Sequence, residues 1–357
     1  MTLRQIKRVK LSELVDQNIN EIPMIELNKL ISQNVVKINN VSGCLYCGVK
    51  NKKYCRSHTI PKFVLKNIAT DGKVKTVNAI LDLPILKKES GIANAGLFKL
   101  ICQQCDSKIF NLYENESNYT KEPTQALLSQ IVMKNSLADV YLRIQMVANL
   151  ISMDMDHQLQ EKDIQSEIKN FKTAVSNIHS ENNPYHILFF KKLDYVVPVA
   201  CQSIVVPVVD FEGNLLNDIL NGNTVDNVLQ LCIFPFEKES VVLLFMDKIS
   251  FRNKYNNFAN QIANLNERNK LSTINYLLTE RQDFLFLHKN ITENCINNPE
   301  IKTMFDKSDR YLMLDSITAL EREIFLVNEF NLNKISMIEN LLLPKYAIKN
   351  KGDSQYC

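Results

Sequence analysis

The strongest constraint on this chain is a pair of Cys-x-x-Cys motifs, Cys44-Leu-Tyr-Cys47 and Cys102-Gln-Gln-Cys105. A tight turn in such a motif presents two thiolates to one ion, and Zn²⁺ binds four thiolates tetrahedrally at about 2.3 Å. The segment around the motifs, residues 40–118, has only short apolar pieces, so it needs a source of stability other than a large core. We therefore predict a structural zinc ion held by all four cysteines.

Other uses of these cysteines fit the pattern less well. Disulfides are disfavoured in a reducing compartment, and a redox role needs only one such motif in a thioredoxin-like setting that is absent here. Cys55, also within the cluster, could replace one zinc ligand or stay unligated. The four remaining cysteines stand apart in the sequence, as buried small hydrophobic residues do: Cys201, Cys232, Cys295 and Cys357.

Between the two motifs lies the segment Arg56-Ser57-His58-Thr59-Ile60-Pro61-Lys62. The order of its parts, Cys-x-x-Cys, then Ser-His-x-Ile-Pro, then Cys-x-x-Cys followed at once by a polar residue, resembles the zinc-containing branch of the HNH (ββα-metal) endonucleases. The resemblance covers residues 44–114, under a quarter of the chain. It implies a small treble-clef or ββα-metal module stapled by zinc.

The resemblance also implies roles for individual residues. His58 matches the histidine that acts as general base on the attacking water, a task suited to an imidazole with a pKa of about 6.5. Asp106 stands where the family usually has the Asn that orients this histidine. Glu114 stands where the following helix usually supplies a ligand for a catalytic Mg²⁺ or Mn²⁺ ion, which would stabilise charge on the phosphate.

Charge favours a polyanionic partner for the first part of the chain. Residues 1–110 carry 18 Lys and Arg against 8 Asp and Glu, whereas the rest carries 24 against 31. A basic segment joined to an acidic one suggests that only the first meets nucleic acid. We expect double-stranded DNA as the partner, with Lys62, Lys66 and Lys108 contacting the phosphate backbone.

Two departures from the family pattern bear on the catalytic site. The residue before the histidine is often Asp or His and helps to hold the metal, whereas Ser57 is a poor ligand. Asp106 replaces Asn, and the metal site would have to be built from Asp106, Glu114 or Glu116. Two alternatives therefore stay open: His58 could cap or ligate the zinc in an inert module, and Glu114 could lie on a solvated helix face.

The rest of the chain indicates an α+β protein. Residues 11–36 and 123–178 have helical periodicity, and helices return after residue 251. The β-branched and aromatic runs predict strands at residues 186–190, 195–200, 203–209, 228–234 and 240–246. We predict four parts: an N-terminal helical segment (1–39), the zinc nuclease module (40–122) with an insertion at about 69–98, a helical connector (123–182), and an α+β domain with a helical C-terminal region (183–357).

The function predicted from these observations is a metal-dependent, cytoplasmic DNA endonuclease. A compact nuclease tethered to a larger body resembles the layout of restriction and antiviral defence effectors. The alternatives are a zinc-dependent nucleic-acid-binding protein without catalysis and an interaction scaffold. No apolar run is long enough to span a bilayer, and no nucleotide-binding motif occurs. The sequence does not determine which DNA sequence is the target or what the oligomeric state is, and a homo-oligomer is possible.

Overall fold

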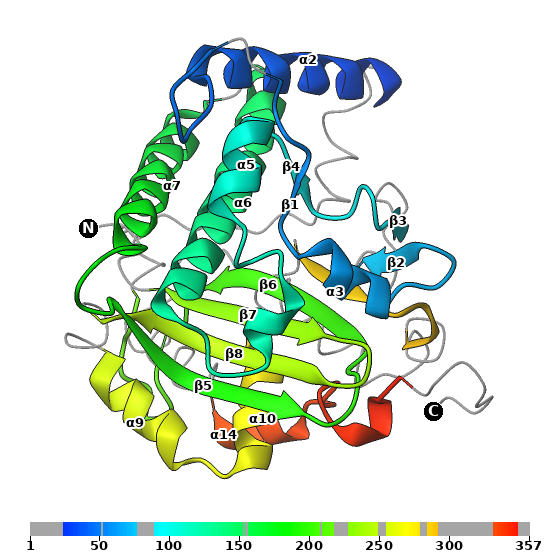
Figure 1. The fold of residues 1–357 in the computed structure, drawn as a ribbon, viewed down its shortest axis with the longest axis vertical. Coiled ribbons are helices and arrows are strands. Elements are labelled where there is room, and N and C mark those ends of the chain that lie inside the picture. Colours follow the sequence, from blue (N-terminus) through cyan, green and yellow to red (C-terminus); the bar gives the residue numbers. More distant parts are fainter. Residues whose placement is uncertain are drawn as a thin grey trace, which may run out of the picture. The chain divides into compact units, whose positions relative to one another are not determined.

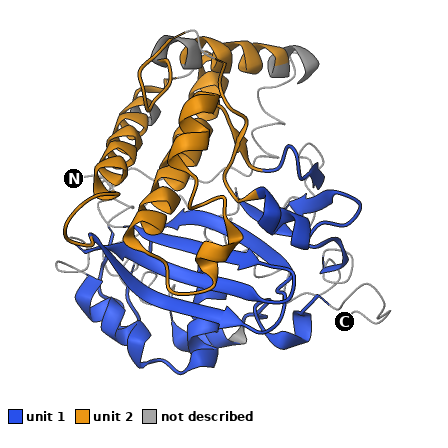
Figure 2. Ribbon diagram, viewed as in Figure 1, with its two compact units in different colours: residues 1–8, 62–95, 184–357 blue, residues 9–61, 96–183 orange. Residues whose placement is uncertain are grey.

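The computed structural model describes residues 24–50, 53–76, 89–152, 154, 156–207, 209–217, 228–248, 255–278, 284–291 and 331–348. The chain divides into two compact units (Figures 1 and 2). Unit 1 comprises residues 1–8, 62–95 and 184–357, and unit 2 comprises residues 9–61 and 96–183. Each unit is thus assembled from segments that are distant in the sequence.

Unit 1 is built on a seven-stranded antiparallel sheet with the strand order β3-β2-β9-β6-β7-β8-β5. Its long strands are rich in β-branched and aromatic residues, which suit a pleated and buried surface. The strands are β2 (Lys73–Thr76), β3 (Glu89–Gly91), β5 (Tyr185–Leu193), β6 (Val199–Val205), β7 (Leu229–Pro235), β8 (Ser240–Asp247) and β9 (Leu285–Leu287).

One face of this sheet carries the main core of unit 1. Alternate residues of β6, β7 and β8 point into it, as the period of two in a strand requires. The helices α9 (Asn256–Asn264), α10 (Glu267–Leu278) and α14 (Leu332–Met337) cover this face (Figure 1). In α9 the buried Phe258 and Ile262 lie one turn apart, which gives the helix a single apolar side.

The predicted strands are found with one correction. The runs at 186–190, 228–234 and 240–246 lie in β5, β7 and β8. The runs at 195–200 and 203–209 are wrong as two strands, because both contribute to the single strand β6. This strand begins directly after Pro198, which cannot donate a ladder hydrogen bond, and ends before Pro207.

Residues 62–95 belong to unit 1, so the insertion predicted at about 69–98 overlaps this segment but begins and ends later than it does. The segment contributes the short helix α3 (Lys62–Asn67) and the strands β2 and β3. Asn67 of α3 donates hydrogen bonds from Nδ2 to the carbonyl oxygens of Phe63 and Pro235. Residues 77–88, in the middle of the predicted insertion, lie outside the described residues.

Unit 2 is mostly helical. It contains α2 (Met24–Ser42), α5 (Gln103–Ile109), α6 (Gln125–Ser152) and α7 (Gln158–Asn177), with the two-residue strands β1 (Ser57–His58) and β4 (Leu97–Phe98). The predicted helical stretch 123–178 is therefore two helices, and α6 is buried along most of its length. Of the predicted helix at 11–36, the part before residue 24 lies outside the described residues.

The protein is thus of the mixed α+β class, as predicted. Among the described residues, no helix is both long enough and apolar enough to cross a membrane. The four-part domain division of the sequence stays a prediction.

The core of unit 1 makes a direct prediction about stability. Leu231 lies in the middle of β7 and is fully buried. We expect Leu231→Ala to lower the free energy of unfolding by about 2–5 kcal/mol, because it removes buried methyl groups and leaves a cavity. Urea denaturation measures this loss, and Leu215→Ala is the control, since Leu215 is 44% exposed. Equal effects of the two substitutions would contradict the placement of the core.

Candidate functional site

The first Cys-x-x-Cys motif forms a tight turn in unit 2. The amide of Gly48 donates to the carbonyl oxygen of Cys44 at 2.7 Å, and the amide of Cys44 donates to Val49 at 3.1 Å. Gly48 has a φ of +71°, a conformation that residues with a Cβ rarely adopt. This glycine allows the chain to double back directly after Cys47, which brings the two sulfurs of the motif together.

The second motif lies at the start of α5. Cys102 is the N-cap of this helix, and Cys105 is buried in its first turn. Two backbone hydrogen bonds tie this motif to the first part of the module: the amide of Leu45 donates to Leu100 at 3.1 Å, and the amide of Cys55 donates to Ile101 at 2.8 Å. The backbone therefore holds the two motifs against each other.

All four sulfur atoms gather in one cluster. The sulfurs of Cys44, Cys47, Cys102 and Cys105 lie within 4.8 Å of one another. Four thiolates around tetrahedral Zn²⁺ at about 2.3 Å would stand about 3.8 Å apart, so the set fits a zinc ion with little adjustment. Among the described residues this is the one grouping of three or more His, Cys, Asp or Glu side chains that could hold a metal ion. His58 and Cys55 lie outside it.

The pKa values of the thiols in this module shift in different directions, and the direction does not by itself identify a metal ligand, because burial and the neighbouring cysteines also raise the pKa of Cys105. Burial raises the pKa of the Cys44 thiol, but hydrogen bonds from backbone amides, including that of Cys102 at 3.3 Å, outweigh burial and lower the pKa to about 7. Burial and the nearby carboxylate of Asp106 instead raise the pKa of Cys55 to about 11. Cys44 is thus prepared to bind a metal as a thiolate, whereas Cys55 stays a thiol.

His58 lies on a short hairpin-like pair of strands next to the cysteine cluster. Strand β1 pairs antiparallel with β4, with Ser57 opposite Phe98 and His58 opposite Leu97. The pair is extended by the amide of Thr59, which donates to Gly96 at 2.8 Å. Helix α5 follows β4 directly, so the order along this part of unit 2 is strand, strand, helix. The His58 side chain is partly exposed, whereas Ser57 is buried.

Asp106, the residue after the second motif, contacts the strand that carries His58. The Ser57 hydroxyl donates to Asp106 Oδ1 at 2.5 Å, and the Cys55 thiol donates to Asp106 Oδ2 at 3.4 Å. Asp106 therefore joins helix α5 to the segment that precedes His58. Asp106 was predicted from the resemblance as a residue of the catalytic site, and in the structure its carboxylate is hydrogen-bonded to Ser57.

A buried lysine from α6 completes this cluster. Lys134 Nζ donates to Ser57 Oγ at 2.7 Å and lies 3.4 Å from Asp106 Oδ1 and 3.3 Å from Glu114 Oε1. The Lys134 side chain is 0% exposed, and its ammonium lies 4.0 Å from the centre of the Phe110 ring. We call Ser57, Asp106, Glu114 and Lys134 the lysine cluster.

Lys134 was not among the site residues predicted from the sequence, although the sequence contains a signal for it. Residues 125–142 read as a strongly apolar helix that contains one cation, Lys134, and one anion, Asp139. A lone charge in such a buried stretch needs a partner, because an unpaired buried charge is costly. The sequence does not show which residue is the partner of Lys134, since Ser57 lies 77 positions away in the chain.

The predicted DNA-contacting lysines are all exposed but belong to different units. Lys108 lies in the last turn of α5 in unit 2, whereas Lys62 and Lys66 lie on α3 of unit 1. Lys108 is therefore the predicted contact that shares a unit with His58.

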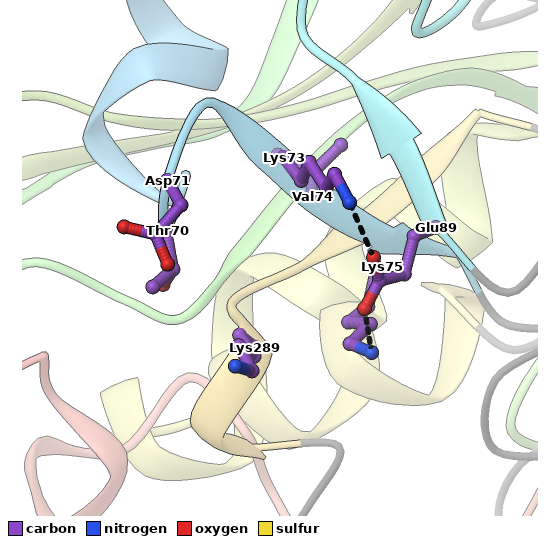
Figure 3. Close-up of a pocket in the computed structure, with 7 residues that line it drawn as sticks. All are labelled: Thr70, Asp71, Lys73, Val74, Lys75, Glu89 and Lys289. Atoms are coloured by element: carbon purple, nitrogen blue, oxygen red, sulfur yellow. Dashed lines mark hydrogen bonds and ion pairs between the residues drawn. The ribbon is translucent and has the colours of Figure 1, made fainter.

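Unit 1 has a small polar hollow of its own, of about 250 Å³, beside strands β2 and β3 (Figure 3). Lys73 and Lys75 on β2 both form ion pairs with Glu89 on β3. Asp71, with a φ of +53°, forms the turn before β2, and Lys289 stands at the other side of the hollow. The ion pairs hold the two strands together.

Comparison with known proteins gives no further guidance. No protein-family model, no curated protein and no solved structure matches this chain. The site is therefore interpreted from its own residues.

The cysteine cluster predicts a specific pattern of metal loss. We expect the purified protein to carry zinc, and Cys44→Ser or Cys105→Ser to release most of it and to unfold the module around it, because structural zinc supplies folding free energy. Cys55→Ser is the matched control and should retain zinc, since Cys55 lies outside the cluster. Elemental analysis together with circular dichroism measures both. Full zinc content in Cys105→Ser would contradict the four-ligand assignment.

Proposed function

We propose that unit 2 contains a zinc-stapled endonuclease module of the HNH kind, in which His58 is the general base that hydrolyses phosphodiester bonds of DNA. The observation that carries the proposal is the position of His58. It lies on a strand paired with a second strand and followed by a helix, beside four cysteines suited to zinc. This arrangement supports the proposal.

The chemistry assigned to His58 needs a partly exposed imidazole on a rigid support. The ring would accept a proton from a water molecule as the water oxygen bonds to phosphorus and the bond from phosphorus to the leaving oxygen breaks. The neighbouring Ser57 is buried and hydrogen-bonded to Asp106 and Lys134, which fixes the backbone that carries His58. Imidazole is the side-chain group whose ordinary pKa lies closest to neutrality, which suits it to act as a general base.

The catalytic Mg²⁺ or Mn²⁺ ion predicted from the resemblance does not fit the lysine cluster as it stands. Asp106 Oδ1 and Glu114 Oε1 both already contact the ammonium of Lys134. A dication bound by the same oxygens would stand close to this buried positive charge. We therefore assign no step of the reaction to such an ion.

Exposed positive charge supports DNA as the substrate class. Lys108 is exposed on the helix that follows β4, and the first 110 residues are strongly basic in composition. Cations that neutralise phosphates release counterions and so supply affinity without regard to base sequence. We further propose a role in restriction or defence against phage, because a compact nuclease joined to a larger body resembles the domain layout of such effectors. If cells that express the protein are protected against no phage in a broad panel, this role is contradicted.

A plasmid-cleavage assay tests the nuclease. We expect zinc-loaded wild type to convert supercoiled plasmid to nicked or linear forms and His58→Ala to lose at least about a hundredfold of the rate, since general-base catalysis contributes this much. His179→Ala is the control, because His179 is exposed on the same unit and away from the module's motifs. Both variants must match wild type in zinc content.

The outcomes of this assay are distinct. Loss of cleavage in His58→Ala alone supports the proposal. Equal cleavage by wild type and His58→Ala would indicate a contaminating nuclease, and absence of cleavage by zinc-loaded wild type, with or without added Mg²⁺ or Mn²⁺, would contradict the proposal.

The second candidate function is zinc-dependent DNA binding without catalysis, and the lysine cluster favours it. The carboxylates that would hold a catalytic ion are engaged by Lys134. This function predicts salt-sensitive DNA binding that His58→Ala leaves unchanged. Lys108→Ala should weaken binding and reduce the slope of log affinity against log salt by about 1, because one phosphate contact is lost. An unchanged slope, measured by fluorescence anisotropy, would exclude Lys108 from the interface.

A further inference from the structure

We propose that the Lys134 ammonium is a built-in cation that takes the place of a divalent ion between Asp106 and Glu114, so that these carboxylates bind neither Mg²⁺ nor Mn²⁺. Lys134 is thereby a positioning residue for the segment that carries His58. Its significance for catalysis rests on the proposed nuclease function, but the exclusion of the metal ion does not.

The contacts of Lys134 match those expected of a small cation in this place. Its Nζ reaches Ser57 at 2.7 Å, Glu114 at 3.3 Å and Asp106 at 3.4 Å. Ser57 lies on strand β1, Asp106 lies within helix α5, and Glu114 lies in the turn that follows this helix. A single cation therefore ties together three parts of the module that are separated in sequence, as a metal ion would.

The lysine is held firmly in this position. An ammonium group has three donors and is costly to bury unless it is paired and hydrogen-bonded. Here the side chain is 0% exposed, and two carboxylates and a hydroxyl surround its ammonium. The Phe110 ring, 4.0 Å away, adds an attractive aromatic face. The charge is therefore fully covered by protein atoms and is paired on two sides, although the Glu114 side chain itself is 42% exposed.

A divalent ion at the same oxygens would be disfavoured by this buried charge. Mg²⁺ binds oxygen ligands at about 2.1 Å, so a dication on Asp106 Oδ1 or Glu114 Oε1 would stand only a few ångströms from Lys134 Nζ. Like charges at such separations repel, most strongly at Asp106, whose side chain is 18% exposed, and less at Glu114, whose side chain is 42% exposed. In addition, Asp106 Oδ1 already accepts the Ser57 hydroxyl at 2.5 Å, and Oδ2 accepts the Cys55 thiol at 3.4 Å.

The test measures Mn²⁺ binding directly on zinc-loaded full-length protein. Mn²⁺ is a hard ion that prefers oxygen ligands and leaves the thiolate-bound zinc in place. Free and bound Mn²⁺ are quantified by electron paramagnetic resonance, and the thermal midpoint is followed with and without Mn²⁺. The proteins are wild type, Lys134→Met and the double variant Lys134→Met with Asp106→Asn.

We expect wild type to bind no Mn²⁺ at the cluster and to show no Mn²⁺-dependent rise in its thermal midpoint. Lys134→Met keeps the length of the side chain and removes its charge, so it should gain one bound Mn²⁺ and be stabilised by that ion. The double variant should lose the gained site. If Lys134→Met does not fold, Lys134→Gln replaces it, and addition of Mn²⁺ during refolding should restore the fold of either variant.

Two results would overturn the inference. One is stoichiometric Mn²⁺ binding by wild type that Asp106→Asn or Glu114→Gln abolishes. The other is failure of both lysine variants to gain Mn²⁺ binding or Mn²⁺-dependent folding.

These results are separable from the nuclease question. A wild type that cleaves plasmid and binds Mn²⁺ at Asp106 overturns the inference and leaves the nuclease. A wild type that neither cleaves nor binds Mn²⁺ leaves the inference and overturns the nuclease.

Discussion

The four-thiolate cluster is the interaction on which the rest of unit 2's small module depends. The strands β1 and β4 have two residues each, and α5 has seven. Elements of this length cannot bury enough apolar surface to be stable alone. Four cysteines from two motifs, Cys44 with Cys47 and Cys102 with Cys105, gather where one zinc ion can bind them. A zinc ion bound there would cross-link the segments on either side of His58, and the buried side chains of Ile60, Phe98 and Phe110 add apolar packing around it.

A zinc cross-link at this cluster would also help the chain to accommodate the segment 62–95, which lies in unit 1. Residues 62–95 leave the module after Pro61, contribute α3, β2 and β3 to unit 1, and return at Gly96. The amide of Thr59 and the carbonyl of Gly96 are hydrogen-bonded at 2.8 Å, so the chain closes at the point where it left. Because the entropic cost of closing a loop grows slowly with its length, the cysteine cluster on one side of this closure can hold it.

Much of this site could be predicted from the sequence, because its chemistry lies in short motifs. The cysteine pairs predicted the cluster, and the family resemblance singled out His58 and Asp106 as candidate site residues. The α+β class and the strands β5, β7 and β8 followed from local patterns. The strands β2 and β3 could not be predicted, because segments such as Lys73–Thr76 and Glu89–Gly91 are short and polar, and their pairing with each other and with β9 is decided by distant residues. The contacts of Lys134 could not be predicted either, because its partners Ser57, Asp106 and Glu114 lie on other segments of the chain.

The contacts of Lys134 offer one explanation for both departures from the pattern of the family that the sequence resembles, Ser57 in place of Asp or His and Asp106 in place of Asn. Ser57 stands where a metal ligand is common, and its hydroxyl both accepts from Lys134 and donates to Asp106, which an Asp or His at this position would not do in the same way. Asp106 stands where Asn is usual, and its carboxylate, together with that of Glu114, supplies the negative charge that a buried ammonium requires. A metal ligand at position 57 and a neutral amide at position 106 would suit a bound ion. Serine and aspartate at these positions suit a lysine.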